Sequence, residues 1–433
     1  MLHVGSGLRW PRMDVVTAEP RAAGRLWYFD LTADQRKAFW AAYLGWTLDG
    51  FDYYILSLLL VDVQRSFTVS SALAGALATV TLMFRVLGGI GAGIAADRFG
   101  RKLPLMLGIL WYSSFAFLSA FSTSYGMLFA CRALFGVGMG GVWSAGMPLA
   151  IEHCPPRHRG VVSGLLQGGY ALGVILAAAV YQFGYPLVSD QPEGWRMLMW
   201  VGILPASLVL WIMRYVKESP VWLERRKHVA SGQLKQGSFA HLFRRDMLPI
   251  TLHTTILLAS ILFLYNSITW WYPTLLDQWH LARLPFITAF STGGIAGAFI
   301  CGRLSETGLG RRGSAVLMTV IGILAVPLYL FTDGTATVLA GAAMMGVFGT
   351  GAFGVVPTYL SERFPTAARG LGAGFAYQAG AALAAIGPTL IGSMKDNGIA
   401  LASAMAICIL ISGLLTIVFF WIGPETRGWK LEN

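Results

Sequence analysis

Long apolar stretches, separated by short polar segments, run along almost the whole chain. Each holds about 20 residues, enough for an α-helix to cross the roughly 30 Å of hydrocarbon in a bilayer. Six lie in the first half of the chain, at 38–61, 70–95, 103–122, 126–152, 160–184 and 196–216. Six more follow at 247–272, 285–304, 314–331, 337–360, 370–394 and 399–422. The pattern predicts an all-α membrane protein with twelve transmembrane helices.

The two halves of the chain share a set of residues between these stretches. In the first half they are Glu152, Pro155, Arg159, Gly160 and Gly164, and at the same spacing in the second half stand Glu362, Pro365, Arg369, Gly370 and Gly374. Repeated halves related by an axis along the bilayer normal place a substrate site between two bundles. We therefore expect two pseudo-symmetric six-helix bundles, at 38–216 and 247–422. A tail at 1–37, a linker at 217–246 and a tail at 423–433 complete the predicted division.

Composition and charge agree with a membrane protein. Apolar residues make up 55% of the 433 residues and charged residues 12%, about half the charged share of a soluble domain. The net charge of +11 comes from Lys and Arg that gather in the loops on one side, while Arg65, Arg196, Arg283 and Lys395 fall on the other. The crowded side is cytoplasmic by the positive-inside rule. We expect a multi-pass plasma membrane protein, in a bacterial inner membrane, with both termini cytoplasmic and no nucleic-acid partner.

The remaining motifs indicate no enzyme, metal site or cofactor. The four cysteines are scattered singly, without the spacing of a metal or redox motif. Two glycine-rich runs, 136–141 and 349–354, lie inside predicted helices, where small residues let helices pack closely. A dinucleotide-binding run would instead follow a strand and open a helix. We therefore expect no catalytic residues, and helix packing as the role of both runs.

The loop after the second predicted helix carries a specific motif. Residues Gly93 to Lys102 read GIAADRFGRK, which resembles the signature loop of the major facilitator superfamily, a twelve-helix transporter fold. The repeated loops at 152–164 and 362–374 resemble the loops after helices 4 and 10 of that superfamily. The resemblance implies a cytoplasmic gate whose salt bridges join the two halves in one conformation and release in the other. We expect its members to be Asp97, Arg98, Arg101, Glu152, Arg159, Glu362 and Arg369, and the alternative is charged loops that only fix the topology.

Charged residues inside predicted helices are expensive and are usually kept for function. At 1.5 Å per residue, Asp49 lies roughly 16 Å and Arg85 roughly 18 Å from the cytoplasmic face, so both are near the midplane. Asp52 shares a helix face with Asp49, and two carboxylates that repel one another suit a group that takes up and releases a proton. Arg132 lies near the outer end of its helix, where we expect a place in the proton path or a structural role.

The stretch Leu48 to Asp52 reads LDGFD, which resembles the first-helix motif of two organic-acid branches of the superfamily. These are the sialate/proton symporters, which include lactate-type carriers, and the aromatic acid/proton symporters. The resemblance implies uptake of a small organic anion, such as a monocarboxylate, aromatic acid or sugar acid, together with a proton. An acid that this resemblance leads us to expect in the fourth helix is replaced in the run 141–143, which reads GVW.

The predicted site combines the midplane charges with neutral residues of the second half. We expect Arg85 to hold the substrate carboxylate and either Asp49 or Asp52 to carry the proton, which is the coupling ion and takes the place of any cofactor. A permanent ion pair between Arg85 and one of these carboxylates is the alternative. Further substrate-binding residues are expected at Tyr54, Tyr265, Asn266, Trp270, Tyr377 and Gln378, some of which will be ordinary helix packing. The second possible function is a neutral sugar/proton porter, and we expect a monomer surrounded by lipid.

Overall fold

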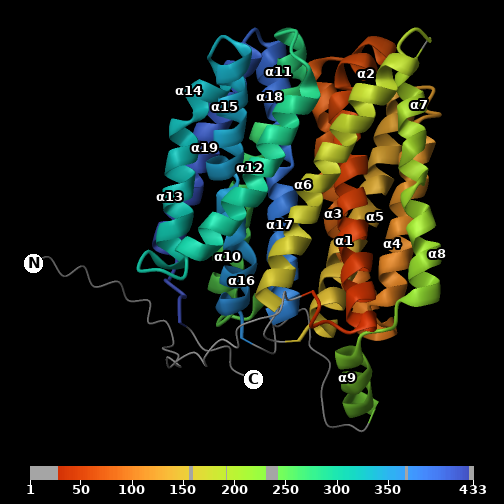
Figure 1. The fold of residues 1–433 in the computed structure, drawn as a ribbon, viewed down its shortest axis with the longest axis vertical. Helices are drawn as coiled ribbons and strands as arrows, with labels where there is room; N and C mark the ends of the chain where they lie inside the picture. Colours follow the sequence, from red (N-terminus) through yellow and green to blue (C-terminus); the bar gives the residue numbers. More distant parts are fainter. Residues whose placement is uncertain (1–27, 156–158, 192, 231–241, 366–368, 429–433) are drawn as a thin grey trace, which may run out of the picture.

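The computed structural model describes residues 28–155, 159–191, 193–230, 242–365 and 369–428. Within them, ten helices are long and apolar enough to cross a membrane. Two further long segments run beside these ten over a similar height, one being α1 (Ala33–Leu58) and the other the pair α13 (Gly310–Leu324) and α14 (Val326–Leu330) (Figure 1). The described part of the chain contains helices and no strands, so the all-α membrane fold expected from the apolar pattern is confirmed.

The first half consists of α1 and nine further helical elements. They are α2 (Leu60–Phe67), α3 (Ser71–Phe99), α4 (Lys102–Ser119), α5 (Tyr125–His153), α6 (Arg159–Gly184), η2 (Tyr185–Leu187), α7 (Trp195–Met199), η3 (Trp200–Ile203) and α8 (Pro205–Tyr215). Polar caps begin several of them: Thr32 forms a capping box with Gln35 before α1, and Ser70 and Ser124 accept backbone N–H groups at the starts of α3 and α5. These caps fix where the long helices start.

The second half repeats the arrangement with more interruptions. Besides α13 and α14 it contains α10 (Leu248–Thr269), α11 (Tyr272–Gln278), α12 (Arg283–Leu304), α15 (Thr335–Met344), η5 (Met345–Gly349), η6 (Gly351–Gly354), α16 (Val356–Arg363), α17 (Arg369–Ala384), α18 (Ile386–Asp396) and α19 (Leu401–Ile422). Pro273, Pro327 and Pro357 stand in the first turns of α11, α14 and α16. Because proline has no N–H to donate, it interrupts a long span at these points.

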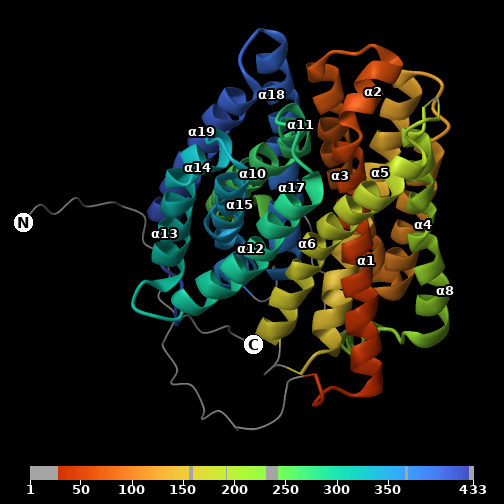
Figure 2. The ribbon, with the colours of Figure 1, turned by 45° about the horizontal axis from the view of Figure 1, so that its top comes forward.

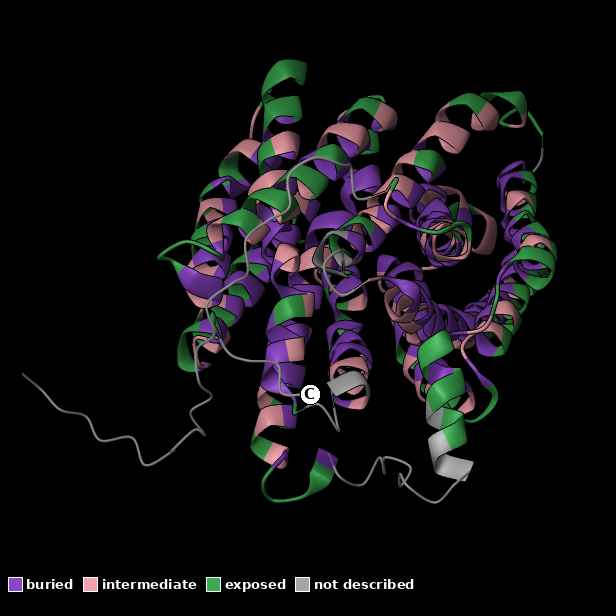
Figure 3. Cartoon of the chain, turned by 60° about the horizontal axis from the view of Figure 1, so that its bottom comes forward, coloured by how far each residue is buried: buried purple, intermediate pink, exposed green. Residues whose placement is uncertain are grey.

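The two halves form two bundles that stand side by side (Figure 2). Seen from the end at which α9 (Pro220–Ala230) lies, the long helices turn many exposed residues outward and buried residues inward (Figure 3). The outward residues include large apolar side chains such as Leu210, Leu414 and Trp421, which are 66%, 57% and 65% exposed. So much exposed apolar surface is unlike a soluble protein and suits contact with lipid. Helix α9 falls in the predicted linker, of which residues 231–241 lie outside the described ones.

Glycines bring α3 and α5 into close contact. A Cβ atom on Gly140 would lie 2.0 Å from the backbone oxygen of Arg85, and one on Gly136 would lie 2.1 Å from that of Thr81. No larger residue fits at either position without moving a helix. The glycine run 136–141 therefore packs helices, as the sequence predicted, and it fixes the height of Arg85 against α5.

Candidate functional site

A cavity of about 520 Å³ lies between the two bundles. Its walls come from α1, α3 and α6 of the first half and from α10, α12 and α17 of the second. Toward the α9 end it is lined by Gly302, Arg303, Pro357 and Thr358. Eight aromatic residues line it, namely Trp46, Tyr53, Tyr170, Tyr265, Phe290, Phe299, Phe353 and Tyr377. The cavity is thus placed where a duplicated transporter fold binds its substrate.

Arg85 of α3 is the buried cation of this cavity. It is 4% exposed, and its guanidinium lies 5.2 Å from the ring centroid of Trp46 and 5.6 Å from that of Tyr377. Its Nε and Nη2 atoms have no hydrogen-bond partner among the described residues. These two nitrogens form one edge of the guanidinium and point their N–H groups in parallel, which is the geometry that binds both oxygens of a carboxylate. The aromatic rings therefore hold a cation whose carboxylate-binding edge is unpaired.

Asp49 and Asp52 are both 0% exposed, and neither carboxylate accepts a hydrogen bond from the described residues. The positive charge of Arg85 attracts the carboxylate of Asp49, whereas that of Arg132 attracts the carboxylate of Asp52. Neither aspartate lines the cavity. A Cβ atom on Gly202 would lie 3.3 Å from Oδ1 of Asp52, so this carboxylate faces η3. The two carboxylates of α1 therefore belong to different surroundings.

The described ion pairs do not include one between Arg85 and either aspartate. The alternative expectation, a permanent ion pair that satisfies a buried Arg85, is therefore not what this conformation contains. Arg132 is also buried, at 1% exposed, and donates to the backbone oxygen of Asp52 at 3.4 Å. It lies over the ring of Phe135 and does not line the cavity. Arg132 thus sits inside the first bundle.

The predicted neutral residues divide into two groups. Tyr265, Asn266 and Tyr377 line the cavity. Tyr54 instead donates to the backbone oxygen of Thr269 at 3.3 Å. The remaining two also lie at contacts between the halves, where Trp270 packs against Tyr53 and Gln378 donates to Ser144 at 3.5 Å. The structure thus brings three of the six to the cavity, and their role in binding stays a prediction.

Several lining residues were not singled out from the sequence. The aromatic ones are Trp46, Tyr53, Tyr170, Phe290, Phe299 and Phe353. An aromatic side chain in a transmembrane helix is equally suited to lipid, to a neighbouring helix or to a cavity, so its type carries no signal of its own. Only the rotational position of each helix, which the packing determines, turns these rings toward the space between the bundles.

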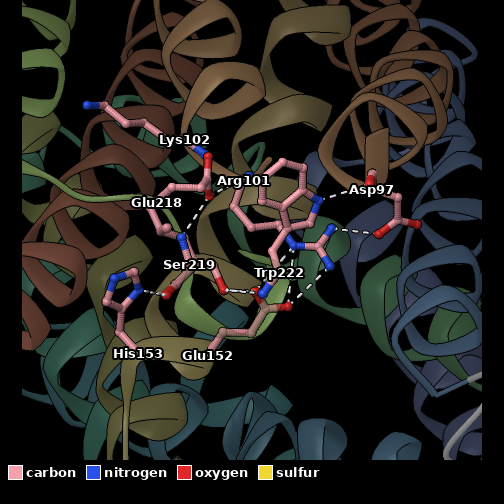
Figure 4. Close-up of polar contacts among 9 residues, drawn as sticks. Asp97, Arg101, Lys102, Glu152, His153, Glu218, Ser219 and Trp222 are labelled. Atoms are coloured by element: carbon pink, nitrogen blue, oxygen red, sulfur yellow. Dashed lines mark hydrogen bonds and ion pairs between the residues drawn. The ribbon is translucent and has the colours of Figure 1, made fainter. Parts of the chain in front are cut away.

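Three of the predicted gate residues of the first half, Asp97, Arg101 and Glu152, form one cluster at the α9 end (Figure 4). Arg101 pairs with Asp97 at 2.7 Å and with Glu152 at 3.1 Å. Glu218 accepts the backbone N–H of Arg101 at 2.8 Å and that of Lys102 at 3.1 Å, which caps α4. Anions at a helix N-terminus are favourable. Burial alone would lower the pKa of Arg101, but the charges of Glu152 and Asp97 prevail and raise it above the ordinary arginine value.

The same cluster recurs in the second half with different residues. Arg311 pairs with Glu306 at 2.6 Å and with Glu362 at 3.1 Å. Glu425 accepts the backbone N–H groups of Arg311 and Arg312 at 2.9 and 3.0 Å, which caps α13 in the way that Glu218 caps α4. Arg311 was missed by the sequence analysis, although it follows Glu306 nearly as Arg101 follows Asp97.

Both clusters differ from the expected gate in one respect. Their ion pairs join helices of the same half, whereas we expected salt bridges between the halves. Arg98 takes no part in these pairs and lies over the ring of Phe99. The side chains of Arg159 and Arg369 lie outside the described ones. In this conformation the clusters bind each bundle together, and their part in gating stays a prediction.

Several of the hydrogen bonds between the halves lie at the end opposite α9. The carboxylate of Asp396 accepts the backbone N–H of Ser71 at 3.0 Å and that of Ala72 at 2.7 Å. The hydroxyls of Thr79 and Thr389 lie 2.6 Å apart. The cavity reaches toward the α9 end, and these bonds join the halves at the other end. A ligand would therefore enter the cavity from the α9 end in this conformation.

Comparison with known proteins agrees with this architecture. Residues 42–286 match the Major Facilitator Superfamily. A probable 4-methylmuconolactone transporter of Cupriavidus pinatubonensis is 34% identical, over 94% of each chain. The sialic acid transporter NanX of Escherichia coli is 29% identical, over 84% of this chain and 88% of its own. The crystal structure of a D-xylose–proton symporter matches with a TM-score of 0.73 and 20% identity, over 92% of this chain and 99% of that one. The chain therefore belongs to the major facilitator superfamily and is a multi-pass membrane transporter, not an enzyme.

Proposed function

We propose that the protein imports a small organic anion together with a proton. The observation that carries this proposal is the unpaired Nε and Nη2 edge of Arg85 in the wall of the cavity. We further propose that the α9 end is cytoplasmic, that both termini lie on that side, and that the membrane is the plasma membrane, in a bacterium the inner one. The distribution of Lys and Arg supports this orientation.

A carboxylate suits the cavity better than a neutral ligand. An arginine near the bilayer midplane costs about 2.5 to 3.5 kcal/mol even on the lenient insertion scale. A neutral sugar would leave the positive charge of Arg85 uncompensated, whereas a carboxylate compensates it and accepts both N–H groups. The likeness to a sialic acid transporter supports an acidic substrate as well.

Proton coupling follows from the charge balance around Arg85. Arg85 is the cation that faces Asp49, whose carboxylate accepts no hydrogen bond in the part of the chain that the structure describes. When a substrate carboxylate binds Arg85, two negative charges would share one cation in a buried place, which is unfavourable. A proton taken up by Asp49 removes one of them, so loading would require an anion and a proton together. Asp52 faces Arg132 and η3 instead, which makes Asp49 the better candidate for the proton carrier.

Pairs of an acid and a neutral compound of similar shape test the anion proposal on the purified protein. Benzoate and benzamide form one pair, nicotinate and nicotinamide a second, and D-glucuronate and D-glucose a third, with L-lactate added as a small acid. A ligand that binds the folded protein raises its thermal unfolding midpoint. We expect stabilisation by at least one acid and none by its neutral counterpart, followed by measurable equilibrium binding of that acid.

Two arginine variants locate the binding. Arg85→Lys keeps the positive charge but loses the planar edge, so it should weaken binding of that acid at least tenfold. Arg303→Lys is the matched control, since Arg303 also lines the cavity but is exposed at its α9 end. Tight binding of a neutral ligand by the parent, or parental acid affinity in Arg85→Lys, would contradict the proposal and favour the neutral sugar porter.

A further inference from the structure

Two aromatic residues from opposite halves meet beside Arg85. The indole of Trp143 on α5 and the ring of Tyr377 on α17 are stacked, with centroids 4.4 Å apart and planes 8° from parallel. Tyr377 also lies under the guanidinium of Arg85, which rests against Trp46 as well. Four side chains thus form a continuous series from α1 through α3 and α17 to α5. One member, Tyr377, touches both the candidate anion-binding residue and the partner from the other bundle.

The stack lies between Arg85 and the α9 end. By the rise of an α-helix, Arg85 is roughly 21 Å from the end of α3, Trp143 roughly 15 Å from the end of α5, and Tyr377 roughly 12 Å from the start of α17. All three of these helix ends face α9. A ligand bound to Arg85 would therefore meet the stack if it moved toward the α9 end along α5 and α17. On the side of α12 and α16 the cavity is open toward that end.

We propose that Trp143 and Tyr377 form a gate on the α9 side of Arg85, and that Tyr377 is a positioning residue that links anion binding to this gate. The linkage rests on the proposed function, whereas the gate does not. An aromatic stack has a narrow range of favourable geometries, so a small displacement of one bundle against the other separates the rings. A carboxylate that fixes the Arg85 guanidinium also fixes the ring of Tyr377 against which it lies. Anion binding then favours the stacked arrangement.

Other contacts near the stack are weaker. Gln378 donates to the backbone oxygen of Gly140 and to Ser144 at 3.5 Å each, at the long limit for a hydrogen bond. The indole N–H of Trp143 has no hydrogen-bond partner among the described residues. The ring stack is therefore the principal contact that holds α5 to α17 at this height. Trp143 belongs to the run 141–143, in which the family resemblance led us to expect an acid. An aromatic gate residue therefore stands where a charged residue was expected.

Chemical labelling tests the gate without any ligand. In the Ser144→Cys protein, the new thiol lies next to the stack and its alkylation from the α9 side reports separation of α5 from α17. The four native cysteines are buried, and their background is measured in protein without the reporter. We expect Trp143→Leu and Tyr377→Leu each to raise the labelling rate about tenfold. Tyr377→Phe, which keeps the ring, should label at the parental rate.

Phe353→Leu is the matched control, because Phe353 also lines the cavity but packs on Tyr265 rather than on the stack. It should leave labelling unchanged. A parental rate in both leucine variants, or an equal rise in Phe353→Leu, would overturn the gate. Folding of each variant is checked by its elution as a single species and by its unfolding midpoint.

The linkage is tested with an equimolar mixture of benzoate, nicotinate, D-glucuronate and L-lactate. The mixture should slow labelling of the reporter severalfold in the parent and in Tyr377→Phe, but not in Tyr377→Leu. Protection that persists in Tyr377→Leu would overturn the positioning role and leave the gate intact. If the mixture does not slow labelling of the parent and Arg85→Lys binds the acid like the parent, the proposed function is wrong. The labelling rates measured without ligand still test the gate in that case.

Discussion

Replacing Asp396 by Asn should shift the transporter toward the conformation that is open opposite α9. Its carboxylate accepts N–H groups of Ser71 and Ala72, at the first turn of α3 in the other half. A hydrogen bond to a charged group contributes about 1.5 to 3 kcal/mol and a neutral one about 1 kcal/mol. Asn keeps a single acceptor oxygen and turns an NH₂ group toward the second N–H, and it also loses the favourable interaction of an anion with a helix N-terminus.

Partial exposure of Asp396 screens part of this effect, so the loss should be about 2 kcal/mol. A loss of that size changes the ratio of the two conformations about 30-fold. Because a labelling rate is proportional to the population of a minor open state, the same factor should appear in the reaction of a thiol that only this opening exposes.

The assay uses Ser291→Cys, a small change at a buried residue of the cavity wall. A membrane-impermeant thiol reagent is applied from the side opposite α9, and the background of the native cysteines is subtracted. Asp333→Asn is the control. Asp333 is exposed in the turn between α14 and α15, and its substitution removes the same charge on the same side. Labelling of Asp396→Asn within twofold of this control would show that the two bonds do not hold the halves together.

Three further substitutions follow from the same contacts. Asp49→Asn should abolish accumulation of the best-binding acid driven by a pH gradient in proteoliposomes, while exchange at equal pH persists. Asp52→Asn should lose less, because Asp52 faces Arg132 and η3 rather than Arg85. Parental accumulation in both variants would remove α1 from proton coupling. Arg311→Gln leaves Glu362, whose side chain is 8% exposed, without its cation and should cost about 3 kcal/mol of stability. Arg101→Gln should cost less, because the side chains of its partners Glu152 and Asp97 are 19% and 45% exposed. The reverse order of thermal unfolding midpoints would contradict this. Gly140→Ala should sharply reduce the yield of folded protein, because the added Cβ atom meets the backbone of α3. Gly93→Ala should not, because the added Cβ atom points into open space. Equal yields would show that α3 and α5 tolerate separation.

The fold could be predicted from the sequence because the apolar pattern is local. Each span needs about 20 apolar residues in a row, and no long-range contact is required to recognise them. Charges at membrane depth are visible for the same reason, and so Asp49 and Arg85 were found. Tyr53 and Tyr54 show where such reasoning ends: these neighbours are chemically identical, yet Tyr53 lines the cavity and Tyr54 bonds to Thr269. Only the rotation of α1 within the packed bundle separates them.

The gate clusters show a different limit of sequence reasoning. The repeat identified Glu152 and Glu362 correctly as equivalent positions, but we expected their ion pairs to cross between the halves. A duplicated set of residues makes the same contacts in each copy, because each bundle folds by the same internal packing. The repeat therefore favoured pairs within a half, as Arg101 with Glu152 and Arg311 with Glu362 show. The same logic would have indicated Arg311, which stands near the position equivalent to Arg101.

This division of contacts bears on how the two bundles would move. The ion clusters at the α9 end fasten helices within each half, so each bundle can turn as a unit without breaking them. Other bonds join the two halves, and those of Asp396 lie at the opposite end. Rocking of rigid bundles about a central site would therefore break the Asp396 bonds and leave both arginine clusters intact. The stack of Trp143 on Tyr377 lies on the α9 side of Arg85 and also crosses between the halves. The transporter thus has contacts between the halves on both sides of its candidate anion site, as alternating access requires.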